Sequence, residues 1–165
     1  VDFTPDTAAV KSLARIGLTF RVKDTFGKVE YNGRGDIETY NDRKEAGLIG
    51  HYKTAAEAMF HYYVKPQATG NRTDVRWMSL SDTRNRLMVA AKTPFQFSVT
   101  PFSDSVIDRT THINQLSRDG LLTVHLDANQ SGVGTATCGP GVAEKYRVPV
   151  KPTSIEFVLY PAMAK

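Results

Sequence analysis

Alternation of apolar and polar residues with a period of two is the feature of this sequence that most restricts its fold. The alternation is strongest over 16–22, 95–99, 122–128 and 155–159. Because successive side chains of a β-strand point to opposite faces of a sheet, this pattern is typical of strands with one buried face. Weaker strand patterns cover 28–31, 74–80 and 87–91. The chain is therefore predicted to consist mainly of antiparallel strands.

Helix signals are few and short. Thr54 and Glu57 have the spacing of a capping box, which predicts a short helix just before the aromatic residues at 60–63. A second short helix is predicted over 103–109. Neither segment is long enough to cover a parallel sheet as a crossover helix does. The predicted fold class is therefore all-β, an antiparallel sandwich with one or two short helices.

The domain organisation follows from length and composition. A chain of 165 residues fits one domain or part of one, and a unit of this size can bury a core without disulfides or metals. The sequence has no repeat, no low-complexity segment and no linker rich in Pro, Gly or Ser. It begins with Val1, and its first residues resemble the interior of a domain. We therefore expect 1–165 to be a single domain that forms part of a larger one.

Charge and hydropathy exclude two classes of partner. The net charge is +4, but Lys and Arg are scattered among 17 acidic residues and form no run longer than two. A nucleic-acid surface needs clustered cations, so no nucleic-acid partner is predicted. No apolar run reaches membrane-spanning length, so no membrane partner is predicted. The single cysteine is compatible with the cytoplasm and with the periplasm.

Local motifs specify no catalytic, nucleotide or metal site. The glycine-rich segment 132–139 has Thr137 where a dinucleotide fingerprint needs its third glycine, and no helix is predicted after it. Cys138 has no histidine at a spacing that would indicate an activated nucleophile. The four histidines lack metal-ligand spacing and are interpreted as structural or solvated. The one tryptophan, Trp77, is interpreted as a core residue of its strand.

Four longer blocks, taken together, resemble one family. GRGDIETYNDR resembles the Gly-Arg-Gly-Pro-x-Glu-x-Tyr-x-Asp-Arg pattern of the β-galactosidases of glycoside hydrolase family 2. LARIGLTF, YYVKPQATGNRTDVRWMSL and VHLDANQSGVGTATCGPGVAEKYRV resemble further blocks of that family. The signature residues to which a structural role is assigned are Gly33, Arg34, Gly35, Glu38, Tyr40, Asp42, Arg43, Asn71, Arg72, Asp74, Arg76 and Trp77. We expect Glu38, Tyr40, Asp42 and Arg43 to hold a turn and its adjoining strand in place.

The resemblance is to the C-terminal small-chain domain of those enzymes, an antiparallel β super-sandwich similar to galactose mutarotase. It implies that 1–165 is the C-terminal portion of such a domain in a parent enzyme that hydrolyses terminal β-D-galactosides with retention. In the family the two catalytic glutamates lie on a TIM barrel earlier in the chain. No catalytic residue and no metal ligand are therefore assigned here, and the chain by itself is expected to be inactive.

The resemblance also implies partners. They are the catalytic barrel of the same parent chain, which this domain buttresses, and the galactoside substrate through the parent active site. A homo-oligomer of the parent is a further implied assembly. No cofactor is assigned to this segment, whereas Mg²⁺ is a metal that the parent enzyme can use.

A loop that reaches the galactose pocket on the barrel is the last implication. Its residues in this sequence are Ser131, Gly132, Val133, Gly134, Thr135, Ala136, Thr137, Cys138, Gly139 and Pro140. In several family members the loop presents a tryptophan just before a Ser-Pro or Gly-Pro step. Counting back from Pro140 places Cys138 there, with a one-residue gap upstream. A cysteine lacks the broad apolar face that stacks on a sugar.

Two alternatives to this interpretation remain. A free-standing carbohydrate-binding or mutarotase-like module would carry its own sugar platform in a cleft. An adhesion ligand would present Arg34, Gly35 and Asp36 at an exposed loop tip. Tripeptide motifs often match by chance, and this one arises because Asp36 stands where the family pattern usually has proline.

Overall fold

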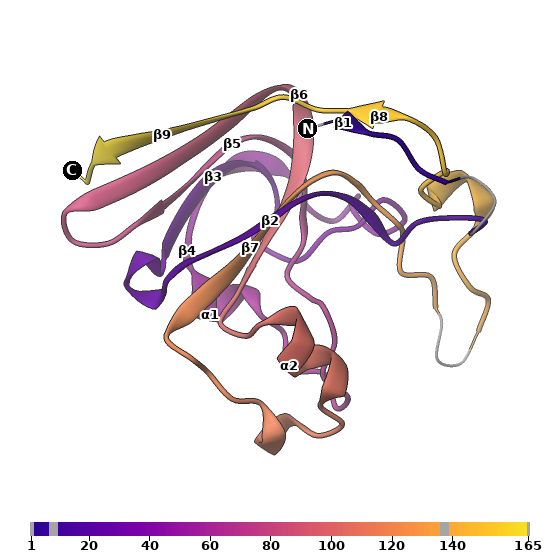
Figure 1. Ribbon diagram of the computed structural model, residues 1–165, viewed down its shortest axis with the longest axis horizontal. Coiled ribbons are helices and arrows are strands. Elements are labelled where there is room, and N and C mark those ends of the chain that lie inside the picture. Colours follow the sequence, from indigo (N-terminus) through magenta and orange to yellow (C-terminus); the bar gives the residue numbers. More distant parts are fainter. Residues whose placement is uncertain (1, 7–9, 136–138, 165) are drawn as a thin grey trace.

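The computed structural model describes residues 2–6, 10–135 and 139–164, and antiparallel strands dominate it (Figure 1). The strands are β1 Asp2–Phe3, β2 Arg15–Lys23, β3 Lys28–Arg34, β4 Ile49–Ala55, β5 Arg72–Ser81, β6 Asn85–Thr100, β7 Leu121–Gln130, β8 Thr153–Ser154 and β9 Phe157–Met163. The α-helices are α1 Ala56–Met59 and α2 Asp104–Arg109, and 3-10 turns cover Asp24–Phe26, Ile113–Gln115 and Glu144–Tyr146. The predicted all-β class, an antiparallel sandwich type with two short helices, is confirmed.

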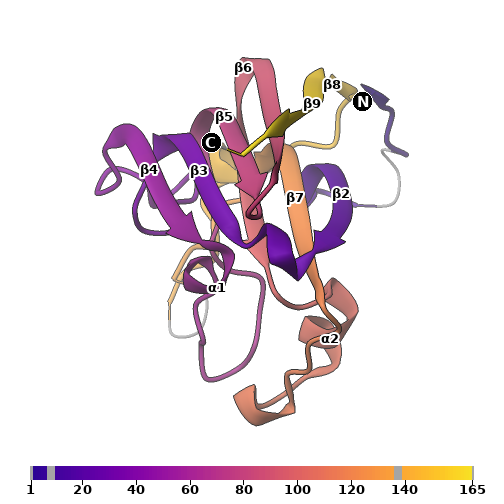
Figure 2. The ribbon, with the colours of Figure 1, turned by 90° about the vertical axis from the view of Figure 1, so that its left-hand side faces the viewer.

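One bent sheet contains seven strands. Its order is β2-β7-β6-β5-β3-β4, and β9 pairs with β6 in addition. The first half of β6 lies between β5 and β9, whereas its second half pairs with β7. Because β6 changes partners along its length, it connects two differently oriented parts of the sheet. Figure 2 shows the strands from β4 to β2 side by side, with both helices at one end of them.

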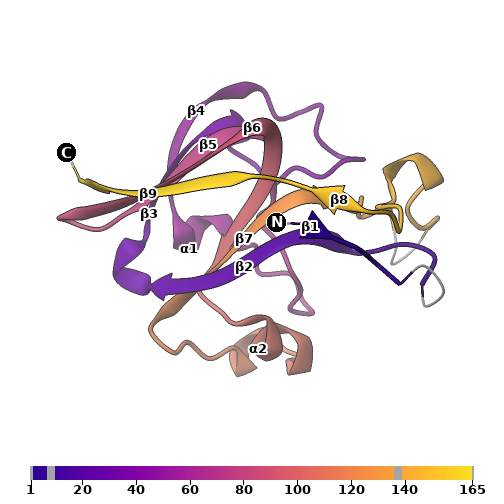
Figure 3. The ribbon, with the colours of Figure 1, turned by 45° about the horizontal axis from the view of Figure 1, so that its top comes forward.

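The main core lies on one face of this sheet. Its fully buried side chains include Tyr31, Met78, Leu80, Val89, Phe95, Phe97, Val99, Val124 and Leu126. Those of the second half of β6 and those of β7 occupy alternate positions, as the sequence pattern predicts. Full burial of such a side chain stabilises the fold by about 1.5–3 kcal/mol, so a one-residue slip of either strand would be costly. The small pair of β1 and β8 lies apart from this sheet, beyond the beginning of β9 (Figure 3).

The opposite face of β6 and β7 is polar and is also buried. Ser98, Thr123, His125 and Asp127 are all buried there. His125 Nε2 lies 3.0 Å from a carboxylate oxygen of Asp104 at the start of α2. Its Nδ1 lies 2.9 Å from the hydroxyl of Thr19 on β2. His125 is therefore a structural residue that ties β2 and α2 to β7, in agreement with the sequence interpretation.

We expect the stability of the fold to fall as the pH drops below about 6.5, the ordinary histidine pKa. Burial, followed by the charge of Arg15, lowers the pKa of His125 against the opposing effects of Asp104 and Asp127. The unfolded chain therefore binds a proton at a higher pH than the folded chain, so the free energy of unfolding decreases in that window. Urea denaturation above and below the histidine pKa measures the decrease. This decrease in the free energy of unfolding should be smaller in His125→Gln. An unchanged pH dependence in that variant would contradict the assignment of the decrease to His125.

Four sequence-based expectations about elements are wrong. β6 is one strand from Asn85 to Thr100, where two strands at 87–91 and 95–99 were predicted. The residues between them resemble a turn, but they lie where β6 exchanges one neighbour for another. The predicted strand over 155–159 begins only at Phe157, and Leu159 is 41% exposed because β9 pairs with β6 alone among the described strands.

Thr54 does not cap a helix. It still pairs with Val29 in the ladder between β4 and β3, and α1 begins at Ala56 without a side-chain cap. Trp77 is not in the core either. The pairing of β5 with β6 is irregular between Val75 and Trp77, which moves the inward position to Met78. Trp77 is consequently half-buried, with its ring centroid 5.3 Å from that of His51.

No helix in the described residues is long and apolar enough to cross a membrane.

Candidate functional site

The signature residues at 33–43 form a compact turn after β3. The backbone amides of Tyr40 and Arg43 each donate to the other residue's carbonyl, at 3.0 and 2.9 Å. This pair of bonds closes the turn and directs Glu38 towards the centre of a cluster and Asp42 towards the loop at 131–135.

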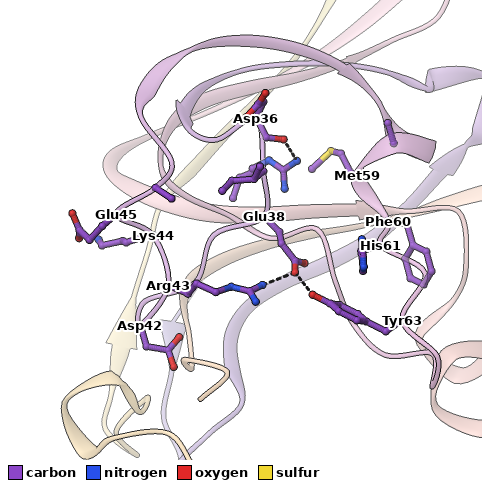
Figure 4. Close-up of a pocket in the computed structure, with 14 residues that line it drawn as sticks. Asp36, Glu38, Asp42, Arg43, Lys44, Glu45, Met59, Phe60, His61 and Tyr63 are labelled. Carbon is purple, nitrogen blue, oxygen red and sulfur yellow. Dashed lines mark hydrogen bonds and ion pairs between the residues drawn. The ribbon is translucent and has the colours of Figure 1, made fainter. Parts of the chain in front are cut away.

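Glu38 accepts hydrogen bonds from four groups. One oxygen accepts from the Tyr63 hydroxyl at 2.6 Å and from the Arg43 guanidinium, as Figure 4 shows. The other accepts from the Gly70 amide at 2.9 Å and the Tyr40 hydroxyl at 3.1 Å. Burial opposes ionisation of Glu38, but the bonds from Tyr63, Gly70 and Tyr40 outweigh it and lower the pKa of Glu38. The carboxylate is therefore charged and fully used in holding the turn.

Gly70 occupies a position that only glycine fits. Its φ of +77° lies in the left-handed region, and a Cβ there would lie 2.2 Å from the Met59 carbonyl oxygen. Its amide reaches Glu38 from this conformation. The segment at 59–70 is thus brought against the signature turn through the main chain.

Arg34 is committed to an ion pair inside the molecule. Its Nε lies 2.5 Å from Asp74, and its Nη1 donates to the Gly47 carbonyl at 3.0 Å. Burial opposes ionisation of Asp74, but hydrogen bonds from Arg34 and Lys44 outweigh it and lower the pKa of Asp74. Arg34 and Asp36 are therefore not displayed together at a free loop tip, and the geometry gives no support to an adhesion role.

Arg72 connects the sequence block at 62–80 to the same turn. Its side chain is buried and donates to the Tyr31 hydroxyl at 2.9 Å and to the Asp36 carbonyl at 2.9 Å. It also donates to the Gly70 carbonyl at 3.1 Å. Asp36, the residue that replaces the usual proline, thus contributes a backbone acceptor here.

The start of the loop at 131–140 is anchored on this turn. Asp42 accepts from the amides of Val133 at 3.0 Å and Gly134 at 2.7 Å. Asn41 donates to the Gln130 carbonyl at 2.7 Å. Ser131, Gly132, Val133, Gly134, Thr135, Gly139 and Pro140 are described, whereas Ala136, Thr137 and Cys138 lie outside the described residues.

Gln96 and Asn41 are among the polar residues of the site that sequence reasoning missed. Gln96 donates to Asn41 at 2.9 Å and accepts from Asn71 at 2.8 Å. The available signal was a polar residue between Phe95 and Phe97 in a strand whose two faces are both buried. Asn41 itself stands at an unspecified position of the signature pattern, so nothing in the pattern distinguished it.

A buried ion pair joins the sequence block at 13–20 to the block at 124–148. Arg15 on β2 contacts both carboxylate oxygens of Asp127 on β7, and Asp127 is 2% exposed. Burial raises the pKa of Asp127, while the charge of Arg15 acts in the opposite direction. Arg15 also donates to the Gln130 side chain at 3.4 Å, and the Gln130 carbonyl accepts from Asn41. All four blocks therefore meet in one polar network around the base of the loop at 131–140.

A cleft of about 680 Å³ lies beside the network, between the turn at 36–46 and the segment at 58–63 (Figure 4). Among the charged residues that line it, Glu38, Arg43 and Lys44 are paired with protein groups. Within 2–6, 10–135 and 139–164, no group of three or more His, Cys, Asp or Glu could hold a metal ion.

The remaining signature residues lie at different depths. Gly33 and Gly35 are buried in and just after β3. Arg76 is exposed on β5 and makes no hydrogen bond or ion pair with the described residues, so it does not join the network. The side chains of Glu38, Tyr40, Asp42 and Arg43 all make hydrogen bonds within the chain.

Comparison with known proteins gives a consistent family. The beta galactosidase small chain family matches residues 1–159. The beta-galactosidase of Kluyveromyces lactis is 32% identical over 149 residues, which cover 88% of this chain and 14% of that protein. That of Actinobacillus pleuropneumoniae is 30% identical over 147 residues, 89% of this chain and 14% of that protein. The beta-galactosidase of Staphylococcus xylosus is 29% identical over 136 residues, which cover 82% of this chain and 14% of that protein.

The chain thus spans about 14% of the length of these curated relatives. Because the family match extends over nearly the whole sequence, from β1 to the first residues of β9, it covers every block of the polar network. This protein belongs to the beta galactosidase small chain family.

Proposed function

We propose that this chain is a non-catalytic part of a β-galactosidase, which buttresses the catalytic barrel of the same parent chain and lends the loop at 131–140 to the active-site entrance. The parent would hydrolyse terminal β-D-galactosides with two glutamates of its barrel, by the retaining mechanism. The family match supports the enzyme class. The observation that carries the proposal is that the signature side chains bond to one another and to the base of that loop.

A loop that forms one wall of an active site has to be held in position before substrate arrives, because ordering it on binding costs conformational entropy. The loop here is held from three sides. Ser131 donates to the Ala14 carbonyl at 2.8 Å, and Gly132 donates to the Tyr146 carbonyl at 2.9 Å. Asp42 accepts from the next two amides. These bonds are what a preorganised loop that lines an active site requires, and they do not depend on catalytic groups in the loop.

The proposal also concerns the metal, the substrate and the association of the parent enzyme. We expect any Mg²⁺ of the parent to be bound by residues of other segments. The galactoside would contact this chain only through the parent active site, and association of parent copies would use surfaces outside the network.

Activity of the parent with and without an intact loop tests the proposal. The full-length parent should hydrolyse a chromogenic β-galactoside, whereas the separate chain, shown to be folded by circular dichroism, should not. Replacing 132–140 in the parent by a short Gly-Ser linker should lower kcat/KM by about 100-fold, the cost of a misplaced positioning element. Turnover by the separate chain would refute the proposal.

Calorimetric titration with galactose and lactose addresses the main alternative. The separate chain should show no binding at millimolar sugar, because Glu38, Arg43 and Lys44 of its cleft already bind protein groups. Millimolar or tighter binding would instead favour a free-standing carbohydrate-binding module.

A further inference from the structure

We propose that Asp42 is a positioning residue that sets the conformation of the entrance loop and, through it, the apparent affinity of the parent for galactosides. This inference rests on the proposed function and assigns a specific role to one carboxylate. Its basis is the contact between Asp42 and the described part of the loop.

The Asp42 carboxylate bridges two consecutive peptide groups. Its Oδ1 accepts from the Val133 amide at 3.0 Å, and its Oδ2 accepts from the Gly134 amide at 2.7 Å. Each oxygen serves one amide, so the two bonds fix the orientation of successive peptide planes. Hydrogen bonds to an ionised acceptor are about twice as strong as neutral ones.

The glycines of the loop permit this contact. A Cβ on Gly132 would lie 2.5 Å from the Asp42 carboxyl carbon, so any side chain there would push the carboxylate away. Gly134 has a φ of +61°, in the left-handed region. The Ser-Gly-Val-Gly segment is therefore fitted to the carboxylate that faces it.

The orientation set at Val133 and Gly134 continues to the far arm of the loop. The next residue, Thr135, donates its amide to the Pro140 carbonyl at 3.2 Å and its hydroxyl to the same oxygen at 3.0 Å. The two arms are thus joined directly beyond the Asp42 contact. A change in the Asp42 bonds would move both arms together.

Asp42 is also held in position by contacts of its own turn. The backbone pair of Tyr40 and Arg43 encloses it. Its neighbour Asn41 donates to the side chain of Asn129 at 2.7 Å and to the Gln130 carbonyl at 2.7 Å. The carboxylate therefore acts from a fixed support, as a positioning group requires.

Loss of the two bonds should reduce the fraction of parent molecules whose loop is in place. Apparent affinity falls by the same factor as the binding-competent fraction. The affected quantity is therefore KM, while the glutamates on the barrel still perform the chemical steps. A purely structural role would instead lower thermal stability and the amount of active enzyme, and would leave KM unchanged.

Asp42→Asn in the full-length parent tests the inference, with Asp36→Asn as the matched control. The amide introduced by Asp42→Asn keeps the size of the side chain but removes one acceptor and the charge. KM for a β-galactoside should therefore rise about tenfold, with kcat little changed. Asp36 carries the same charge in the same turn, but its exposed carboxylate makes no hydrogen bond with the described residues. Its variant should stay within about twofold of the parent.

Gly132→Ala provides a second variant that keeps the Asp42 charge and displaces the carboxylate by contact. It should also raise KM. An unchanged KM in Asp42→Asn would overturn the inference even if the variant were less stable, and so would an equal rise in Asp36→Asn. Should the unmodified parent fail to hydrolyse β-galactosides, the proposed function fails. If the parent is active and both loop variants keep its KM, only the role of Asp42 fails.

Discussion

Glu38→Ala should lower the free energy of unfolding by about 3 kcal/mol, because the loss of one acceptor leaves several donors unsatisfied. The substitution leaves the hydroxyls of Tyr40 and Tyr63, the Arg43 guanidinium and the Gly70 amide without their common acceptor. Tyr40 is 3% exposed, so its hydroxyl cannot turn to water without opening the turn. Chemical denaturation of the folded chain measures the loss.

Glu45→Ala is the control for that experiment, because Glu45 is an exposed acid of the same turn. Its effect should stay within about 0.5 kcal/mol. The pH dependence provides a second check. The pKa of Glu38 is lowered in the fold, so its stabilisation is present above the ordinary value of 4.5 and is lost as the pH falls through the folded value. Glu38→Gln should therefore differ from the unmodified chain at neutral pH and approach it in strong acid. Equal differences at both pH values would contradict the role of the charge.

Arg15→Met should destabilise the chain by a similar amount, about 3–5 kcal/mol. The variant leaves Asp127, which is 2% exposed, as a buried carboxylate without its cation. Replacing both members, as in Arg15→Met with Asp127→Leu, should recover most of the loss, because a well-packed apolar pair needs no compensating charge. Denaturation of the two single variants and the double variant gives the coupling between the residues.

The stability difference between the unmodified chain and Arg15→Met should depend on pH. Burial raises the pKa of Asp127, and Arg15 opposes that rise, so removing Arg15 leaves the rise unopposed. A raised folded pKa favours folding at low pH and loses that contribution as the pH increases through it. The deficit of the variant should therefore shrink in acid. Simple additivity of the two single substitutions would show that the side chains are not coupled.

β2 and β7 were among the strands predicted best, because apolar and polar residues alternate along both. In β2, Ile16, Leu18, Phe20 and Val22 are at least partly buried, while the intervening residues are exposed. β4 was not predicted, because only one large apolar residue, Tyr52, packs against the core from this edge strand. Edge strands need backbone partners more than apolar side chains, so their sequences carry a weak pattern.

The polar network was predictable only in part. The signature pattern identified Glu38, Tyr40 and Arg43, which lie within a few residues of one another and bond locally. It could not show that Tyr63 and the Gly70 amide complete the same cluster, because those partners depend on how the segment at 59–70 folds back. Asp42 has no such local bond, and its partners come from a loop about 90 residues later in the chain.

The bonds that hold the loop at 131–140 come mostly from the main chain. Val133, Gly134 and Pro140 contribute main-chain atoms, and only Thr135 adds a hydroxyl to its amide. Because main-chain atoms form most of these bonds, substitution of the Val133 side chain should leave the base of the loop in place.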